Sequence, residues 1–145
     1  MAGYSQTPLW RKLGLREDDS LLLLDAPPDW SVPDPPEGVT RISAGRGQLP
    51  DISPAVVVAF FDALSQLRGS ISELAALIFP AGAVWVAWPR RAGGHDSDIR
   101  EQDIRDLALA LGLVDVKVAA LDEDWSGLRL VWRSERRQAS AATPG

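Results

Sequence analysis

The second half of the chain alternates between helix-like and strand-like patterns, and this alternation constrains the fold more than any other feature. Leucine and isoleucine recur at helical spacing over residues 64–78, and a mostly apolar run follows at residues 83–88. A second helical stripe comes next, and then two strand-like runs at residues 114–121 and 128–132. This order is expected of the closing half of a doubly wound α/β domain.

The first half contains three shorter strand-like runs. Residues 20–25 and 55–61 are apolar enough for strands buried on both faces, and residues 39–43 form a weaker strand between them. Five prolines in residues 26–38 exclude a long helix in the first crossover. A short helix is predicted for residues 8–15.

These patterns together predict an α/β, Rossmann-like fold. We expect a doubly wound, mostly parallel sheet of about six strands, with helices on both faces. The last two strands are linked only by residues 122–127, which is too short for a parallel crossover, so they should form a C-terminal antiparallel hairpin. Within that link, Trp125 should anchor the hairpin, and Gly127 should relieve backbone strain.

Local signals mark the ends of the two long helices. Gly69 and Ser70 interrupt the first stripe, and Ser70 with Glu73 is a capping-box pattern. Either one helix or a turn followed by a shorter helix agrees with that pattern. Asp98, with an acid three residues later, is predicted to begin the second helix, and Gly112 to end it.

Composition limits the classes of function. The chain has no cysteine and one histidine, which excludes disulfides and thiolate metal sites, although oxygen ligands for Mg²⁺ or Ca²⁺ are present. A net charge of −5 argues against a nucleic-acid partner. The longest apolar run, residues 55–61, is far below the roughly 20 residues of a membrane helix. With no signal peptide at residues 1–7, we expect a cytoplasmic protein.

We expect one domain over residues 1–133, mobile at residues 1–7, and a disordered tail at residues 134–145. A ligand should lie outside the carboxyl ends of the parallel strands. The loop of residues 88–98 is the strongest candidate there, because it gathers arginines that suit a carboxylate or phosphate. The alternative is a solvated loop whose arginines pair with nearby acids.

Two further groups of residues at this rim have side chains suited to catalysis or metal binding. His95 beside Asp96 and Asp98 has the composition of a general base with an orienting carboxylate, or of an exposed loop. The acids of residues 122–124 are either a magnesium site or a solvated turn. The residues predicted to bind a ligand are Trp88, Arg90, Arg91, His95, Asp98, Asp122, Glu123 and Ser126.

Several segments resemble the sequences of one known family. They are Gly3-Tyr4-Ser5, Thr7-Pro8-Leu9, Lys12-Leu13-Gly14, AVWVAWPRR at residues 83–91, GLVDVKV at 112–118 and DEDWSGLRL at 122–130. The chain thereby resembles the DUF3052 family of small uncharacterised bacterial proteins over roughly residues 1–133. The resemblance implies a small α/β domain similar in outline to class I methyltransferases.

A methyltransferase-like fold normally has a glycine-rich turn after its first strand and an acid at the end of its second. Here that turn is residues 25–29, with Pro27 and Pro28 and no glycine, and the second strand ends without an acid. We therefore expect no cofactor, neither S-adenosylmethionine nor a nicotinamide. The leading hypothesis is a non-catalytic small-ligand or protein-interaction module on a degenerate methyltransferase-like scaffold.

Two alternatives remain open at this point. The chain could be a transferase-like enzyme that acts on a small anionic molecule held by Arg90 and Arg91. It could also be a purely structural subunit, which would require an exposed apolar patch.

Overall fold

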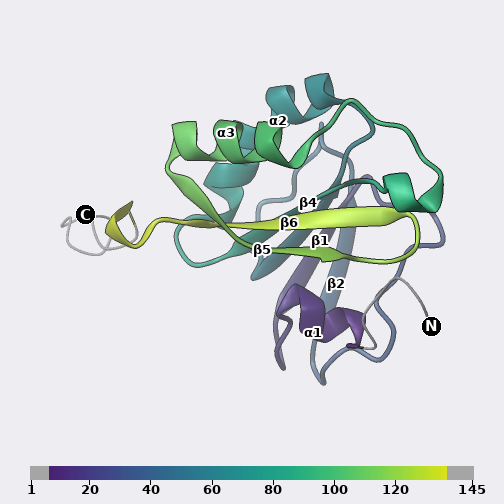
Figure 1. Ribbon diagram of the computed structural model, residues 1–145. Coiled ribbons are helices and arrows are strands. Elements are labelled where there is room, and N and C mark those ends of the chain that lie inside the picture. The colour runs from purple at the N-terminus through teal and green to yellow at the C-terminus, as the bar shows by residue number, and fades with distance from the viewer. Residues whose placement is uncertain (1–6, 137–145) are drawn as a thin grey trace.

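The computed structural model describes residues 7–136; the predictions for residues 1–6 and 137–145 lie outside that range. Six strands form one sheet in the order β2-β1-β3-β4-β6-β5 (Figure 1). The elements are α1 (Leu9–Leu13), β1 (Ser20–Leu24), β2 (Thr40–Ala44), β3 (Val56–Phe60), α2 (Leu64–Ile78), β4 (Ala83–Pro89), the 3-10 turn η1 (Arg91–Gly93), α3 (Glu101–Leu111), β5 (Leu113–Ala120) and β6 (Trp125–Trp132). The predicted doubly wound α/β fold is confirmed.

The sheet is parallel across β2, β1, β3 and β4, and β6 runs antiparallel between β4 and β5. The chain moves outward in one direction from β1 to β2 and in the other from β3 to β4, so the strand order reverses between β1 and β3. That reversal is the switch point, the place where doubly wound sheets open a crevice for ligands. The predicted C-terminal hairpin is present as β5 and β6.

The hairpin turn is shorter than predicted. Trp125, Ser126 and Gly127 do not form a turn; they are the first residues of β6, and they pair with β4 and β5 on either side. Gly127 does not have a positive φ, so backbone strain is not its role. A Cβ there would lie 2.9 Å from the Trp85 ring, which shows that the glycine makes room for that ring.

Two apolar clusters lie on opposite faces of the sheet. Helices α2 and α3 cover one face, as Figure 1 shows, and α1 with the β1–β2 connection covers the other. Helices are therefore present on both faces, but the second face has only a five-residue helix. Trp85 belongs to the α1-side cluster and Trp88 packs on the α2 side, as their opposite parity along β4 predicts.

The first long helix runs without a break through Gly69 and Ser70. Leu67 and Ile71 on either side are buried, whereas Gly69 is exposed, and a Cβ added there would meet no atom outside the local helix backbone within 4 Å. The helix therefore tolerates the glycine because its apolar stripe lies on the other face. The second helix begins at Glu101, not at Asp98.

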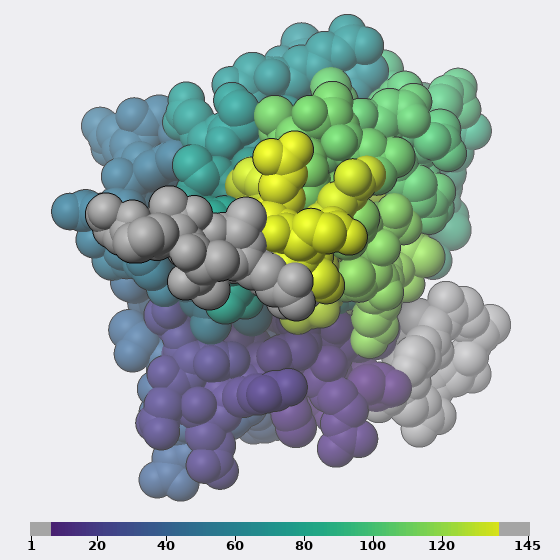
Figure 2. Space-filling view, turned by 90° about the vertical axis from the view of Figure 1, so that its left-hand side faces the viewer, coloured from purple at the N-terminus to yellow at the C-terminus, as the bar shows by residue number. Residues whose placement is uncertain are grey.

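The end of β6 is joined to the helical layer. Trp132 donates a hydrogen bond from Nε1 to the carbonyl oxygen of Ala75, at 2.8 Å, and its ring meets Phe79 edge to face. Figure 2 shows this yellow segment lying between the teal and green parts of the surface. Residues 134–136, the first part of the predicted tail, form a helical turn.

No helix within residues 7–136 is both long enough and apolar enough to span a bilayer.

Candidate ligand-binding site

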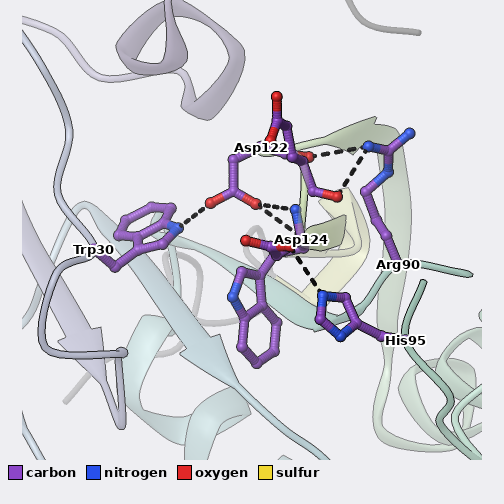
Figure 3. Close-up of polar contacts among 7 residues, drawn as sticks. Trp30, Arg90, His95, Asp122 and Asp124 are labelled. Carbon is purple, nitrogen blue, oxygen red and sulfur yellow. Dashed lines mark hydrogen bonds and ion pairs between the residues drawn. The ribbon is translucent and has the colours of Figure 1, made fainter. Parts of the chain in front are cut away.

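The turn between β5 and β6 is held by the carboxylate of Asp122. Its Oδ1 accepts hydrogen bonds from the backbone N–H groups of Asp124 and Trp125, at 2.8 and 2.7 Å. Its Oδ2 accepts a hydrogen bond from Trp30 Nε1 at 3.0 Å, which joins the turn to the β1–β2 connection (Figure 3). Asp122 therefore orders the rim of the sheet.

The loop after β4 contacts the same turn from the other side. Arg90 donates from Nη1 to the carbonyl oxygens of Asp122 and Glu123, and His95 Nε2 lies 2.9 Å from Asp124 Oδ1 (Figure 3). A Cβ at Gly93 would come within 2.3 Å of the Glu123 carbonyl oxygen, so only glycine allows this close approach. The loop and the turn form one connected unit.

A cavity of about 460 Å³ opens between α1, the β1–β2 connection and this turn. We call it the Trp30 pocket. Its apolar wall includes Leu9, Trp30, Pro33 and Leu121; its carboxylates are Asp29, Asp122, Glu123 and Asp124; Lys12 lies on its inner side. The Trp30 ring is fixed edge to face against Phe60, which meets Trp125 in the same way.

Lys12 is buried and donates a hydrogen bond from Nζ to the carbonyl oxygen of Ala120 at 2.9 Å. Burial lowers the pKa of the Lys12 ammonium, and the positive charges of Lys117 and Arg90 lower it further. The Trp30 pocket therefore combines an apolar wall, several carboxylates and one ammonium group.

A second cavity, of about 330 Å³, lies on the α3 side of the sheet. We call it the Arg91 pocket. It is lined by Trp88, Pro89, Arg91, Ser97, Ile99, Arg100, Glu101 and Ser126.

The structure divides the predicted site residues into separate groups. Asp122 and Glu123 line the Trp30 pocket, whereas Trp88, Arg91 and Ser126 line the Arg91 pocket. Arg90 and His95 hold the turn. No group of three or more histidines and carboxylates within residues 7–136 is placed to hold a metal ion.

Asp98 was predicted to start the second helix and to bind a ligand, and the first of these predictions is wrong. Its Oδ1 accepts the backbone N–H of Leu64 at 2.8 Å, so the carboxylate caps α2, the preceding helix. At the start of α3 the Asp103 carboxylate accepts the Arg100 N–H instead.

Sequence reasoning missed Arg46, whose guanidinium lies at the switch point. Its Nη1 is 2.7 Å from Asp25 Oδ2, just beyond β1, and donates to the carbonyl oxygen of Phe60, the last residue of β3. Its Cζ lies 4.9 Å from the centre of the Phe61 ring. One side chain from the loop after β2 thus spans the carboxyl ends of β1 and β3.

No protein-family model and no curated protein matches the chain. Among solved structures it is similar to a SAM-dependent methyltransferase from Aquifex aeolicus, at 12% identity and TM-score 0.55, covering 83% of this chain and 85% of that one. Magnesium protoporphyrin IX methyltransferase from Synechocystis, with bound SAM, has 13% identity and TM-score 0.55 over 86% and 74% of the two chains.

A protein of the NADB-Rossmann superfamily from Streptococcus agalactiae matches at 9% identity and TM-score 0.54, covering 90% of this chain and 70% of that one. At such low identities, these likenesses show the fold alone. The chain has a Rossmann-like, methyltransferase-like scaffold.

Proposed function

We propose that the protein is a non-catalytic module that binds a small ligand in the Trp30 pocket of a methyltransferase-like scaffold. The observation that carries this proposal is the position of Arg46. Its side chain bridges the carboxyl ends of β1 and β3, where a nucleotide cofactor would bind, and the Trp30 pocket at the same rim is large enough for a small molecule.

The residues at the switch point do not fit S-adenosylmethionine bound in the usual way. The turn after β1 carries Pro27 and Pro28, which have no N–H to donate to a ligand. No acid stands at the end of β2 to hold a ribose; Arg46 follows there. Its positive charge would also repel the sulfonium of the cofactor.

The Trp30 pocket suits a small organic cation with an apolar part. Four carboxylates line it against one lysine, so its electrostatic potential favours a positive group. Tryptophan binds cations on its ring face more strongly than the other aromatic side chains do. We therefore infer that the ligand carries an ammonium group near Trp30.

This inference is tested with benzyltrimethylammonium chloride as the probe. The probe is expected to raise the melting temperature of the wild-type protein, because a ligand that binds only the folded state stabilises it. The shift should be lost in the double variant Asp29→Asn/Glu123→Gln, whose two carboxylates are exposed and make no hydrogen bond or ion pair within residues 7–136.

The control is Asp51→Asn/Glu73→Gln, which removes two exposed acids away from the pocket and changes the net charge equally. It should keep the shift. Equal shifts in both double variants, or an equal shift with sodium benzoate, would contradict a cation site in the Trp30 pocket.

Isothermal titration with S-adenosylmethionine and S-adenosylhomocysteine tests the non-catalytic part of the proposal. We expect no binding of either compound at ligand concentrations up to about 1 mM, which corresponds to a binding free energy weaker than about −4 kcal/mol. A micromolar dissociation constant for either compound would refute this part, whatever the outcome at the Trp30 pocket.

The second candidate is a transferase-like enzyme acting on a small anion. The Arg91 pocket favours it, because Arg91 and Arg100 line the same cavity as two serine hydroxyls. Arg90 does not contribute, since it binds the backbone of the turn. These residues support an anion site on the α3 side as the alternative.

A further inference from the structure

Three cations gather where the end of α1 meets β5 and β6. Lys117 and Arg129 are direct partners in the β5–β6 ladder, and Lys117 Nζ lies 3.4 Å from the carbonyl oxygen of Lys12 at the end of α1. A Cβ on Gly14 would be 3.6 Å from Arg129 Nη2, so the guanidinium lies against the end of the helix. We call Arg16, Lys117 and Arg129 the Arg129 patch.

These cations have no ion-pair partner in the part of the chain that the structure describes. Within residues 7–136, the ion pairs join other side chains, and none includes a member of the Arg129 patch. Residues 1–6 and 137–145 contain no aspartate or glutamate that could pair with them. Among the described residues, the patch is therefore a concentration of unpaired positive charge, in a protein of net charge −5.

Arg129 is the most constrained member of the patch. Its Nε is buried and has no hydrogen-bond partner among the described residues. Burial lowers the pKa of its guanidinium, and the charge of Arg16 lowers it further. A buried polar group without a partner is rare and costs stability, so its presence calls for an explanation.

The geometry suits an oxyanion. An arginine fork matches the oxygens of a phosphate with two parallel hydrogen bonds, and flanking cations add attraction for a doubly charged group. Gly14 is exposed and has no side chain to cover the guanidinium, while Arg16 and Lys117 are themselves exposed. An anion can therefore approach Arg16, Lys117 and the exposed part of the Arg129 side chain from solvent.

We propose that the Arg129 patch binds the phosphate group of a small molecule. This site is separate from the Trp30 pocket, whose carboxylates favour a cation. It is also separate from the Arg91 pocket, which lies on the opposite side of the sheet.

The experiment uses inorganic phosphate as the probe, with sodium chloride at equal ionic strength as the reference. Phosphate should raise the melting temperature of the wild-type chain by mass action. In the double variant Arg16→Gln/Lys117→Gln the dissociation constant for phosphate, measured by titration calorimetry, should rise at least about tenfold. Without phosphate, that variant should melt at the same temperature as the wild type or higher, because repulsion within the patch is reduced.

The charge-matched control is Arg68→Gln/Arg133→Gln, which removes two exposed cations elsewhere. It should bind phosphate as the wild type does. Loss of binding in this control would overturn the proposal. Loss of binding in Arg91→Gln alone would also overturn it, because the phosphate would then bind in the Arg91 pocket. Unchanged binding in the Arg16→Gln/Lys117→Gln variant, or equal stabilisation by acetate, would also overturn it.

Discussion

Replacing Trp85 with alanine is expected to lower the free energy of unfolding by about 3–5 kcal/mol. The side chain is completely buried in the α1-side cluster. Its Nε1 donates a hydrogen bond to the carbonyl oxygen of Leu13 at 3.1 Å, which joins β4 to the end of α1. Urea unfolding followed by far-UV circular dichroism measures the loss.

The matched variant Trp85→Phe separates the ring from its hydrogen bond. Phenylalanine keeps much of the apolar volume but leaves the Leu13 carbonyl without this donor, so the expected loss is smaller, about 1–3 kcal/mol. Equal losses for both variants would show that the hydrogen bond outweighs the packing of the ring. A loss below about 1 kcal/mol for alanine would contradict the buried position of Trp85.

Gly127→Ala is expected to destabilise the protein by about 1–3 kcal/mol, because the added methyl group overpacks the core. The new Cβ would lie 2.9 Å from Trp85 Cε3 and 3.0 Å from two side-chain carbons of Leu121. Both neighbours are buried, so neither can move aside into solvent. The same urea titration gives the change.

Gly69→Ala is the matched control, since it adds the same methyl group in open space on the exposed side of α2. Alanine is the better helix former by about 0.5–1 kcal/mol, so this variant should be more stable than the wild type. A change of the same sign at both positions would show that the contact with Trp85 does not decide the effect at Gly127.

The fold was predictable where a periodic pattern was strong. The apolar runs that became β1 and β3, and the stripes that became α2 and α3, lie where their sequence periods place them. Errors arose where a distant contact decides the local structure. Asp98 has the sequence of a helix start, yet its carboxylate binds the N–H of Leu64, which is 34 positions away.

Prediction of the β5–β6 hairpin was limited in the same way, because contacts with other strands decide its local structure. Residues 125–127 have turn-like composition, and pairing with both β4 and β5 holds them in β6. Gly127 is required because the ring of Trp85, on another strand, lies against it. No local sequence pattern reveals that contact.

The candidate site was only partly predictable. The rule for doubly wound sheets points to the rim at the carboxyl ends of the strands, where Asp122 and Glu123 line a cavity. The sequence prediction groups Arg90 and Arg91 as one pair, although successive residues leaving a strand point to opposite faces. The structure assigns Arg90 to the turn and Arg91 to the α3 side.

Trp30 and Arg46 were missed because irregular loops place them. Trp30 lies in the proline-rich connection, where no periodic pattern indicates which way a side chain points. Arg46 reaches the switch point by folding back from the loop after β2. The signal for Trp30 was a large aromatic residue within a polar, proline-rich segment; Arg46 had no comparable signal.

The place of β6 in the sheet has a consequence during synthesis. β4 pairs with β3 on one side, but its partner on the other side is β6, which follows every other strand within residues 7–136. Until residue 132 has emerged from the ribosome, one edge of β4 has no partner strand in the nascent chain. The first five residues of β4 are buried in the folded protein. Exposed apolar edges of this kind pair readily with other chains. A chain truncated within β5 would therefore be prone to aggregation, whereas the eight residues of β6 protect that edge.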